Sequence, residues 1–301
     1  MNNIIKEIQK YKIGDYLENI LMSKHTTYRV GGITSLLVYP KTPLKLIKLI
    51  KILKNNNIKY RILGNGSNVV FGDKLYDGVI IKLDAFNHLK IKDNFITVGA
   101  GYDLIKLAYE LSEMGLSGLE FAGGIPGKIG GSIYMNAGAY NADMASITSK
   151  IKVITPDLEI KEIENKDLDF GYRKSFLKNN AGYICIEATL VLKPANRDDI
   201  LKLIKDRREK RLSSQPLEYP SAGSVFRNPQ NDYAGRLIED IGLKGHMIGG
   251  AQISSKHANF IINYNQAKAE DIKQLIYLIK DEVKNKHGIE LQIEQEFINW
   301  E

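Results

Sequence analysis

Apolar residues in the first third of the chain recur with the spacing of strands and of one amphipathic helix. Residues 35–39 (SLLVY) and 59–63 (KYRIL) are short apolar runs that predict strands. Between them, residues 44–53 (LKLIKLIKIL) place leucine and isoleucine on one helical face and lysine around the other. The pattern predicts a strand–helix–strand unit, which commonly begins an α/β or α+β domain.

The chain continues as a mixture of strands and helices up to about residue 211. Strands are predicted at 78–83, 95–99, 151–154 and 183–192, and helices at 103–114 and 198–211. A stretch with two prolines at 215–220 indicates a linker, so we expect the main boundary within 205–220.

Beyond this linker the predicted elements become shorter. They are a helix at 233–241, strands at 251–254 and 260–263, and an amphipathic helix at 269–286 that ends before Gly288. Residues 289–298 alternate in character, and we expect them to pair back into a sheet. No repeat of 20–50 residues is present, which counts against solenoids and propellers.

Composition narrows the class of protein. With 301 residues the chain should form two or three domains, and 44% hydrophobic with 26% charged residues is typical of a globular protein. Its single cysteine excludes an internal disulfide and a cysteine-based zinc site. No apolar run approaches the ~18 residues that span a bilayer, and the N-terminal residues lack a secretory pattern. We therefore expect a cytoplasmic protein.

The net charge of +7 suits either an anionic small molecule or a polyanion. The densest basic block, residues 205–211 (KDRREKR), also contains Asp206 and Glu209, so no compact nucleic-acid patch stands out. A solvated, lysine-rich surface accounts for most of the charge. Charge alone leaves both kinds of ligand open.

Several common catalytic motifs are missing. The sequence contains no G-x-G-x-x-G fingerprint, and its one Gly-Lys pair is followed by Ile129 rather than Ser or Thr, which excludes a Walker A loop. No H-E-x-x-H occurs, and the five histidines lie far apart. We expect no metal site.

Two glycine-rich segments remain as candidate binding loops. Residues 64–68 (GNGSN) follow a predicted strand and could form an anion-binding nest, although such a segment alone is more often a tight turn. Residues 121–140 contain six glycines, which lets the main chain run close against a flat or phosphorylated ligand. Together the two segments are consistent with a dinucleotide cradle or with ordinary turns.

Six motifs occur in the order and at the intervals of one enzyme family. They are residues 64–68 (GNGSN), 122–138 (AGGIPGKIGGSIYMNAG), 172–175 (YRKS), 220–229 (PSAGSVFRNP), 233–239 (YAGRLIE) and 249–259 (GGAQISSKHAN). Together they resemble the UDP-N-acetylenolpyruvoylglucosamine reductases, over nearly the whole chain from residue 26 onwards. The compact linker resembles the shorter type of this family, which lacks an inserted tyrosine-bearing substrate loop.

The resemblance implies an α+β fold in three parts. Residues 1–83 and 84–204 would form two α+β subdomains of an FAD-binding region of the PCMH type. Residues 205–288 would form a C-terminal α+β substrate-binding domain, and the strand at 289–301 would pair back onto the first subdomain.

The resemblance also implies the reaction. Members of the family use NADPH as co-substrate to reduce a non-covalently bound FAD. The flavin N5 then passes hydride to the enolpyruvyl methylene carbon of UDP-N-acetylglucosamine enolpyruvate, which gives UDP-N-acetylmuramate in peptidoglycan precursor synthesis. We expect these three ligands, no nucleic acid partner, no membrane insertion and a monomer.

Three residues match the family's catalytic positions. Ser224, within AGSVF, matches the proton donor to the carbon beside the methylene. Arg173, within YRKS, matches the arginine that holds the substrate carboxylate. A guanidinium suits this role because it can bind both carboxylate oxygens. Glu294 aligns with the glutamate of the family's L-E-P-E-V-R motif, where this chain reads LQIEQE, and would stabilise the carboxylate alongside Arg173.

This C-terminal motif departs from the family pattern. Ile293 replaces the proline, and Glu296 stands where an arginine usually follows. A shift of register would make Glu296 the catalytic glutamate, and Glu290 is a weaker rival.

The remaining site residues follow from the same motifs. Flavin contacts are expected at Gly64, Asn65, Gly66, Ser67, Asn68, Gly124, Ile125, Pro126, Gly130, Gly131, Ser132, Asn136 and Gly138. Substrate contacts are expected at Lys210, Asn228 and Gln252.

Two alternatives remain open. The protein could be another FAD oxidoreductase with the same type of FAD-binding domain, some of which attach flavin covalently through histidine; His25 is the nearest candidate, but no family motif supports it. It could also be a non-enzymatic nucleotide-sugar or nucleic-acid binder. A flavin spectrum of the purified protein separates these possibilities.

Overall fold

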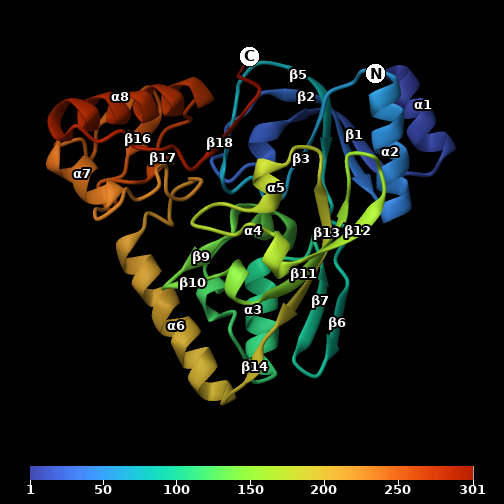
Figure 1. The fold of residues 1–301 in the computed structure, drawn as a ribbon. Coiled ribbons are helices and arrows are strands. Elements are labelled where there is room, and N and C mark those ends of the chain that lie inside the picture. The colour runs from blue at the N-terminus through green and yellow to red at the C-terminus, as the bar shows by residue number, and fades with distance from the viewer. Residues whose placement is uncertain (301) are drawn as a thin grey trace. The chain divides into compact units, whose positions relative to one another are not determined.

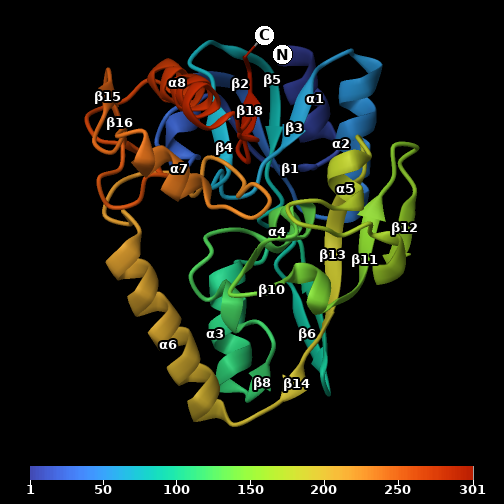
Figure 2. The same cartoon turned by 60° about the vertical axis from the view of Figure 1, so that its left-hand side comes forward.

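The computed structural model describes residues 1–300, which fold into two compact units (Figures 1 and 2). The first unit contains Met1–Glu18, Ser35–Gly64 and Asp77–Glu209. The second contains Asn19–Thr34, Asn65–Tyr76 and the chain from Lys210 onwards. Each unit is thus assembled from three separate stretches of sequence, and both combine helices with strands.

One sheet of the first unit includes both strands of the predicted strand–helix–strand motif. Its strand order is β1 (Gly14–Leu21), β2 (Ile33–Pro40), β5 (Tyr76–Ile81) and β3 (Tyr60–Ile62). Between β2 and β3 in the chain lies α2 (Pro43–Asn55), which packs against α1 (Asn2–Lys10). The Thr42 hydroxyl begins α2 by accepting the N–H of Lys45 at 3.3 Å. Most leucines and isoleucines of α2 are buried in the core, as their spacing predicts, whereas Leu44 in the first turn is exposed.

The second sheet of this unit is antiparallel and has five strands. Their order is β12 (Ile160–Glu164), β11 (Thr148–Ile154), β13 (Ile184–Val191), β7 (Phe95–Gly99) and β6 (Leu89–Lys92). Alternate residues such as Ile151, Ala188 and Val98 belong to the buried core, together with apolar residues of α3 (Leu104–Glu113). The intervening residues of β11 and β12 include paired lysines and glutamates. One face of the sheet is therefore apolar and the other largely polar.

Short elements connect these layers. They are β8 (Leu116–Ser117) paired with β14 (Lys193–Pro194), η2 (Glu120–Ala122), α4 (Ile129–Met135), the hairpin β9 (Gly138–Ala139) and β10 (Ala142–Asp143), η3 (Met144–Ser146), η4 (Asn165–Asp167) and α5 (Phe176–Asn179). The long helix α6 (Arg197–Ser214) then carries the chain from the first unit into the second.

The second unit packs two helices against small sheets. Strands β15 (Met247–Ile248), β16 (Ala251–Ile253) and β17 (Ile261–Asn263) form one sheet, and β4 (Val69–Phe71) pairs in parallel with β18 (Glu296–Ile298). The 3₁₀ helix η1 (Met22–Lys24) and the helices α7 (Ala234–Asp240) and α8 (Ala269–His287) complete it. The apolar stripe of α8 is buried, and the helix ends at Gly288, whose φ of +68° is the left-handed cap that glycine favours.

The α+β class predicted from the sequence is confirmed. The three-part division at residues 83, 204 and 288 stays a prediction, because the compact units group residues 19–34 and 65–76 with the C-terminal part. No helix within residues 1–300 is both long and apolar enough to cross a bilayer. In the same range, His, Cys, Asp and Glu side chains form no cluster of three that could hold a metal ion.

Candidate functional site

Arg173 lies at the tip of a two-residue turn in the first unit. Gly171 and Lys174 exchange two backbone hydrogen bonds, both of 3.1 Å, which places Tyr172 and Arg173 at the centre of the turn. Arg173 has a φ of +55°, a left-handed conformation that residues other than glycine rarely adopt. Its Nη2 donates to the carbonyl oxygen of Gly138 at 3.3 Å. Because strained backbone concentrates at functional positions, this turn is a candidate site.

Two polar side chains hold the turn from either end. The buried Ser175 donates its hydroxyl to the carbonyl oxygen of Tyr134 at 2.7 Å. On the other side, the amide of Asn136 donates to the carbonyl oxygen of Gly171 at 2.9 Å. The backbone that carries Arg173 is thereby tied to α4 and to the residue that ends it.

The glycine-rich segment is exposed to solvent at some positions and buried at others. Gly131 is exposed, and a β-carbon built on it would meet no atom within 4 Å. Partly or fully exposed positions also include Gly124, Ile125, Pro126, Gly130 and Gly138. Ser132 is buried, by contrast, and its hydroxyl donates to the carbonyl oxygen of Lys128 at 2.9 Å. Bare, accessible main chain of this kind lets a flat ligand approach closely, whereas Ser132 uses its polar group within the protein.

Lys128 lies beside Gly64 in the same unit, and its charge interacts with that of Lys82. A β-carbon at Gly64 would lie 3.6 Å from the side chain of Lys128. The ammonium of Lys82, directly after β5, lies 3.9 Å from a carboxylate oxygen of Asp84, and its side chain is only 11% exposed. Burial lowers the pKa of Lys82; the charge of Asp84 opposes this, and the charge of Lys128 lowers it further. The positive charge here suits an anionic ligand.

The loop of residues 65–68 belongs to the second unit. Gly66 has a φ of +65°, and a β-carbon there would lie 2.6 Å from the carbonyl oxygen of His25. Only glycine fits this position without displacing backbone. The carbonyl oxygen of Gly66 accepts the N–H and the hydroxyl of Thr27, at 3.2 and 3.3 Å. The loop is therefore a fixed backbone structure, tied to residues 25–27.

Ser224 lies in a segment that is clamped by its neighbours. Ser224 pairs with Phe260, and the next residue, Val225, donates its N–H to the carbonyl oxygen of Asn259 at 2.9 Å. The buried Asn259 side chain accepts the N–H of Phe226 at 2.9 Å and donates to its carbonyl oxygen at 2.8 Å. Asn259 lies within a recognised motif, but only its long-range contacts reveal it as the residue that fixes the serine segment.

Glu294 lies on the chain segment that pairs with the residue after Ser224. Its N–H donates to the carbonyl oxygen of Val225 at 2.8 Å, and its own carbonyl oxygen accepts the Asn68 side-chain amide at 3.2 Å. Glu296 lies in β18, where its N–H donates to the Asn68 carbonyl oxygen at 2.9 Å. The second unit thus brings the segments of Ser224, Glu294 and the 65–68 loop together. Glu296 lies farther along, beside β4.

A buried polar pair between these segments was not predicted from the sequence. The hydroxyl of Tyr28 is buried, which raises its pKa, and it donates to Oε1 of Gln295 at 3.1 Å. Nε2 of Gln295 donates to the carbonyl oxygens of Ala222, Gly223 and Ser224 at 3.2, 3.4 and 3.5 Å. The pair links the backbone of Ser224 to the segment that carries Glu294.

The three predicted substrate contacts all belong to the second unit, in different settings. Lys210 is exposed on α6. Asn228 accepts the N–H of Ala234 at 3.1 Å, which places it at the start of α7. Gln252 lies in β16 and donates to the carbonyl oxygen of Gly245 at 3.2 Å.

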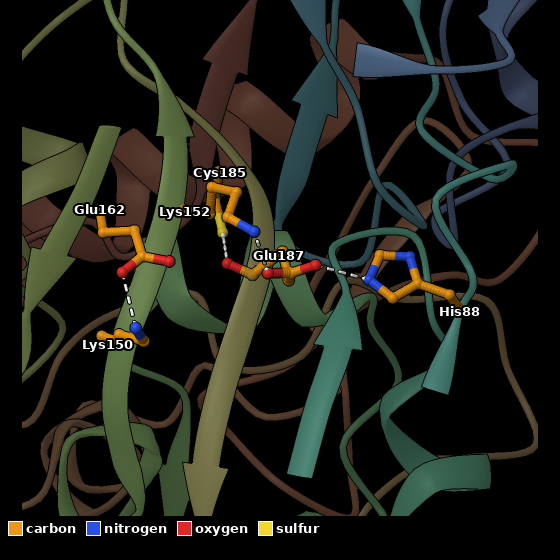
Figure 3. A network of polar contacts seen from close by, with 6 residues as sticks. All are labelled: His88, Lys150, Lys152, Glu162, Cys185 and Glu187. Atoms are coloured by element: carbon orange, nitrogen blue, oxygen red, sulfur yellow. Dashed lines mark hydrogen bonds and ion pairs between the residues drawn. The ribbon is translucent and has the colours of Figure 1, made fainter. Parts of the chain in front are cut away.

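A separate polar network lies on the five-stranded sheet of the first unit (Figure 3). The carboxylate of Glu187 accepts hydrogen bonds from Lys152 at 2.7 Å and makes a 2.8 Å contact with a ring nitrogen of His88. Burial would raise the pKa of Glu187, but the hydrogen bonds from Lys152 and His88 outweigh it, so the pKa lies below its usual value. Burial raises the pKa of the neighbouring Cys185 to about 12, so its thiol is inert. We assign this network to the stability of the sheet.

Comparison with known proteins agrees with these features. A family described as "FAD binding domain" matches residues 34–164, and "UDP-N-acetylenolpyruvoylglucosamine reductase, C-terminal domain" matches residues 215–298. The fold and the backbone loops therefore define an FAD-dependent oxidoreductase.

Curated relatives match the chain over almost its full length. The UDP-N-acetylenolpyruvoylglucosamine reductases of Anoxybacillus flavithermus and Halalkalibacterium halodurans are 44% and 41% identical to it, and each match covers 99% of both chains. The crystal structure of the reductase from Thermus caldophilus superposes with a TM-score of 0.81 at 34% identity, over 94% of this chain and 98% of the other. The chain belongs to the UDP-N-acetylenolpyruvoylglucosamine reductase family.

Proposed function

We propose that this protein reduces UDP-N-acetylglucosamine enolpyruvate to UDP-N-acetylmuramate with NADPH, in peptidoglycan precursor synthesis. The observation that supports it most is the match over 99% of both chains to reductases whose name carries this substrate. FAD, held non-covalently, would supply the redox chemistry by accepting a hydride from NADPH and giving it to the enolpyruvyl methylene carbon.

The residues present fit a bound flavin. Exposed, side-chain-free backbone at Gly131 can lie against a flat ring, because a β-carbon there would only meet open space. Lys128, beside Gly64, offers positive charge to a pyrophosphate. In the second unit, Gly66 keeps the 65–68 loop in a conformation that other residues would not adopt. These loops would hold FAD through main-chain N–H groups.

Ser224 would supply the proton. Hydride addition to the methylene carbon leaves negative charge on the adjacent carbon and its carboxylate, and the Ser224 hydroxyl gives its proton to that carbon. One hydride and one proton thus add across the double bond. The backbone of Ser224 is held by pairing with Phe260 and by the Gln295 amide, which supports a fixed placement of this residue.

Arg173 and Glu294 would stabilise the charge that forms on the carboxylate. The guanidinium stays charged and can bind both carboxylate oxygens. Glu294 would act on the same carboxylate group alongside Arg173. The backbone pairing of Glu294 with Val225, next to Ser224, favours Glu294 over Glu296 for this role.

The two half-reactions provide the test. The purified protein should carry a flavin spectrum, release the flavin on acid denaturation, and be bleached anaerobically by NADPH. Adding UDP-N-acetylglucosamine enolpyruvate should then restore the oxidised spectrum. Reduced flavin that persists with this substrate but reoxidises in air would favour another FAD oxidoreductase, and flavin that stays attached after acid would favour a covalent link, with His25 as first candidate.

A further inference from the structure

The side chain of Asn136 contacts the Arg173 turn of the first unit at Gly171. We propose that Asn136 is a positioning residue that fixes both the backbone and the guanidinium of Arg173 for carboxylate binding. This inference rests on the function proposed for Arg173. It assigns Asn136 a role different from the flavin contact expected from the sequence.

The side chain of Asn136 is used completely within the protein. It is 1% exposed, and its two amide hydrogens go to the Gly171 carbonyl oxygen at 2.9 Å and to Oδ2 of Asp143 at 3.0 Å. Its Oδ1 accepts the N–H of Ala145 at 2.9 Å. An amide with both hydrogens donated to groups of the protein has no donor left for a ligand.

The backbone of Asn136 makes this arrangement possible. Asn136 ends α4 with a φ of +42° and a ψ of +59°, in the left-handed region, which asparagine tolerates better than most residues. This turn at the end of the helix directs the side chain toward the Gly171 and Asp143 segments, as the two hydrogen bonds show.

These contacts form a closed circuit around Arg173. Asn136 holds Gly171, which begins the Arg173 turn, and it also holds Asp143. Asp143 pairs with Gly138 in the β9–β10 hairpin, and the Gly138 carbonyl oxygen accepts the Arg173 guanidinium at 3.3 Å. One amide therefore sets the position of the arginine backbone and of the carbonyl group that orients its side chain.

The test compares the two half-reactions of the FAD-loaded enzyme. Asn136→Asp keeps the shape and the acceptor for Ala145 but removes both donors. Flavin content and the rate of flavin reduction by NADPH should stay within about two-fold of the parent. Reoxidation by the enolpyruvyl nucleotide sugar should slow about 10- to 100-fold, because a displacement of about 1 Å can cost that much. Asp143→Asn, a milder change on the same circuit, should slow the same step less.

Asn165 provides a matched control. Its amide also donates twice, to the carbonyl oxygens of Ala145 and Thr148 at 2.9 and 2.6 Å, but neither bond reaches the Arg173 turn. Asn165→Asp should therefore leave the reoxidation step within about two-fold of the parent, even if it lowers stability. Selective slowing by this control to the extent seen for Asn136→Asp would overturn the proposal.

Combination with Arg173→Ala separates positioning from a structural role. In that background Asn136→Asp should add less than about two-fold, because the group it positions is already gone. Full additivity, equal slowing of both half-reactions, or loss of FAD from both circuit variants would refute positioning. If Arg173→Ala alone leaves reoxidation unchanged, the role proposed for Arg173 fails first, and the inference about Asn136 falls with it.

Discussion

Removal of the Tyr28 hydroxyl should destabilise the second unit measurably. Tyr28 is fully buried and Gln295 is 4% exposed, and their hydrogen bond of 3.1 Å joins positions 267 residues apart. Tyr28→Phe leaves Oε1 of Gln295 buried without its donor, which costs about 1–3 kcal/mol. The packing of the ring is otherwise preserved, so no large cavity contributes to this value.

A double-mutant cycle isolates the pair. Gln295→Met conserves volume but leaves the Tyr28 hydroxyl without its acceptor and removes the donor to the carbonyl oxygens at 222–224, so this single change should cost more than Tyr28→Phe. The double variant has neither the Tyr28 hydroxyl nor the Gln295 side-chain oxygen, so neither group is left buried without the other. The double variant should therefore be more stable than the sum of the two single effects predicts, by roughly 1–2 kcal/mol.

The single tryptophan makes the assay specific to this unit. Trp300 belongs to the second unit and donates its indole N–H to the carbonyl oxygen of Val70 at 2.9 Å. Its fluorescence during urea unfolding, with all variants in the same flavin-loading state, reports the unfolding of that unit. A neutral Tyr28→Phe, or a double variant that costs the full sum, would refute this account of the pair.

Four further outcomes follow from the site and the sheet network. Ser224→Ala should leave reduction of the flavin by NADPH nearly intact but slow its reoxidation by the enolpyruvyl substrate about 10²- to 10⁴-fold, measured by stopped flow; equal slowing of both steps would remove the serine from proton transfer. Arg173→Lys should not support reoxidation at the parent rate in the same assay, because the forked geometry of the guanidinium is lost. Full activity of this variant would exclude the proposed carboxylate contact. Glu294→Gln should impair turnover far more than Glu296→Gln, and the reverse order in steady-state rates would show that the register is shifted. Because the folded-state pKa of Glu187 is lowered, its stabilising effect is present above its usual value of 4.5 and is lost as the pH falls below it. The stability advantage of the parent over Glu187→Gln in urea titrations should therefore shrink from neutral pH to ~pH 4, and a constant difference would contradict that assignment.

The long periodic elements were predictable because their burial pattern is local. Helix α3 spans Leu104–Glu113 against a prediction of 103–114, and β7 spans the predicted residues. Helix α4 was missed because Gly130 and Gly131 disfavour helix and mask the pattern. Tertiary packing compensates there, since a β-carbon on Gly130 would lie only 3.0 Å from that of Ala100.

The catalytic candidates were found through motif resemblance, whereas the residues that hold them were not. Asn136, Asn259 and Gln295 are buried amides, and each has a hydrogen-bond partner in a distant segment, 35, 33 and 267 positions away respectively. The sequence alone does not reveal whether a polar residue forms its hydrogen bonds with solvent, with a ligand or with the protein itself. Only the folded chain distinguishes Asn136, placed among the flavin contacts, as an internal amide.

The pairing of β4 with β18 also constrains how the chain folds during its synthesis. Asn68 and Glu294, which lead into these strands, are 226 positions apart. At about 5–20 residues per second, a ribosome takes roughly 10–45 s to make that interval. Throughout this time the nascent β4 has a free edge, so chaperone protection of this short apolar strand would matter more than for any strand whose partner follows within a hairpin.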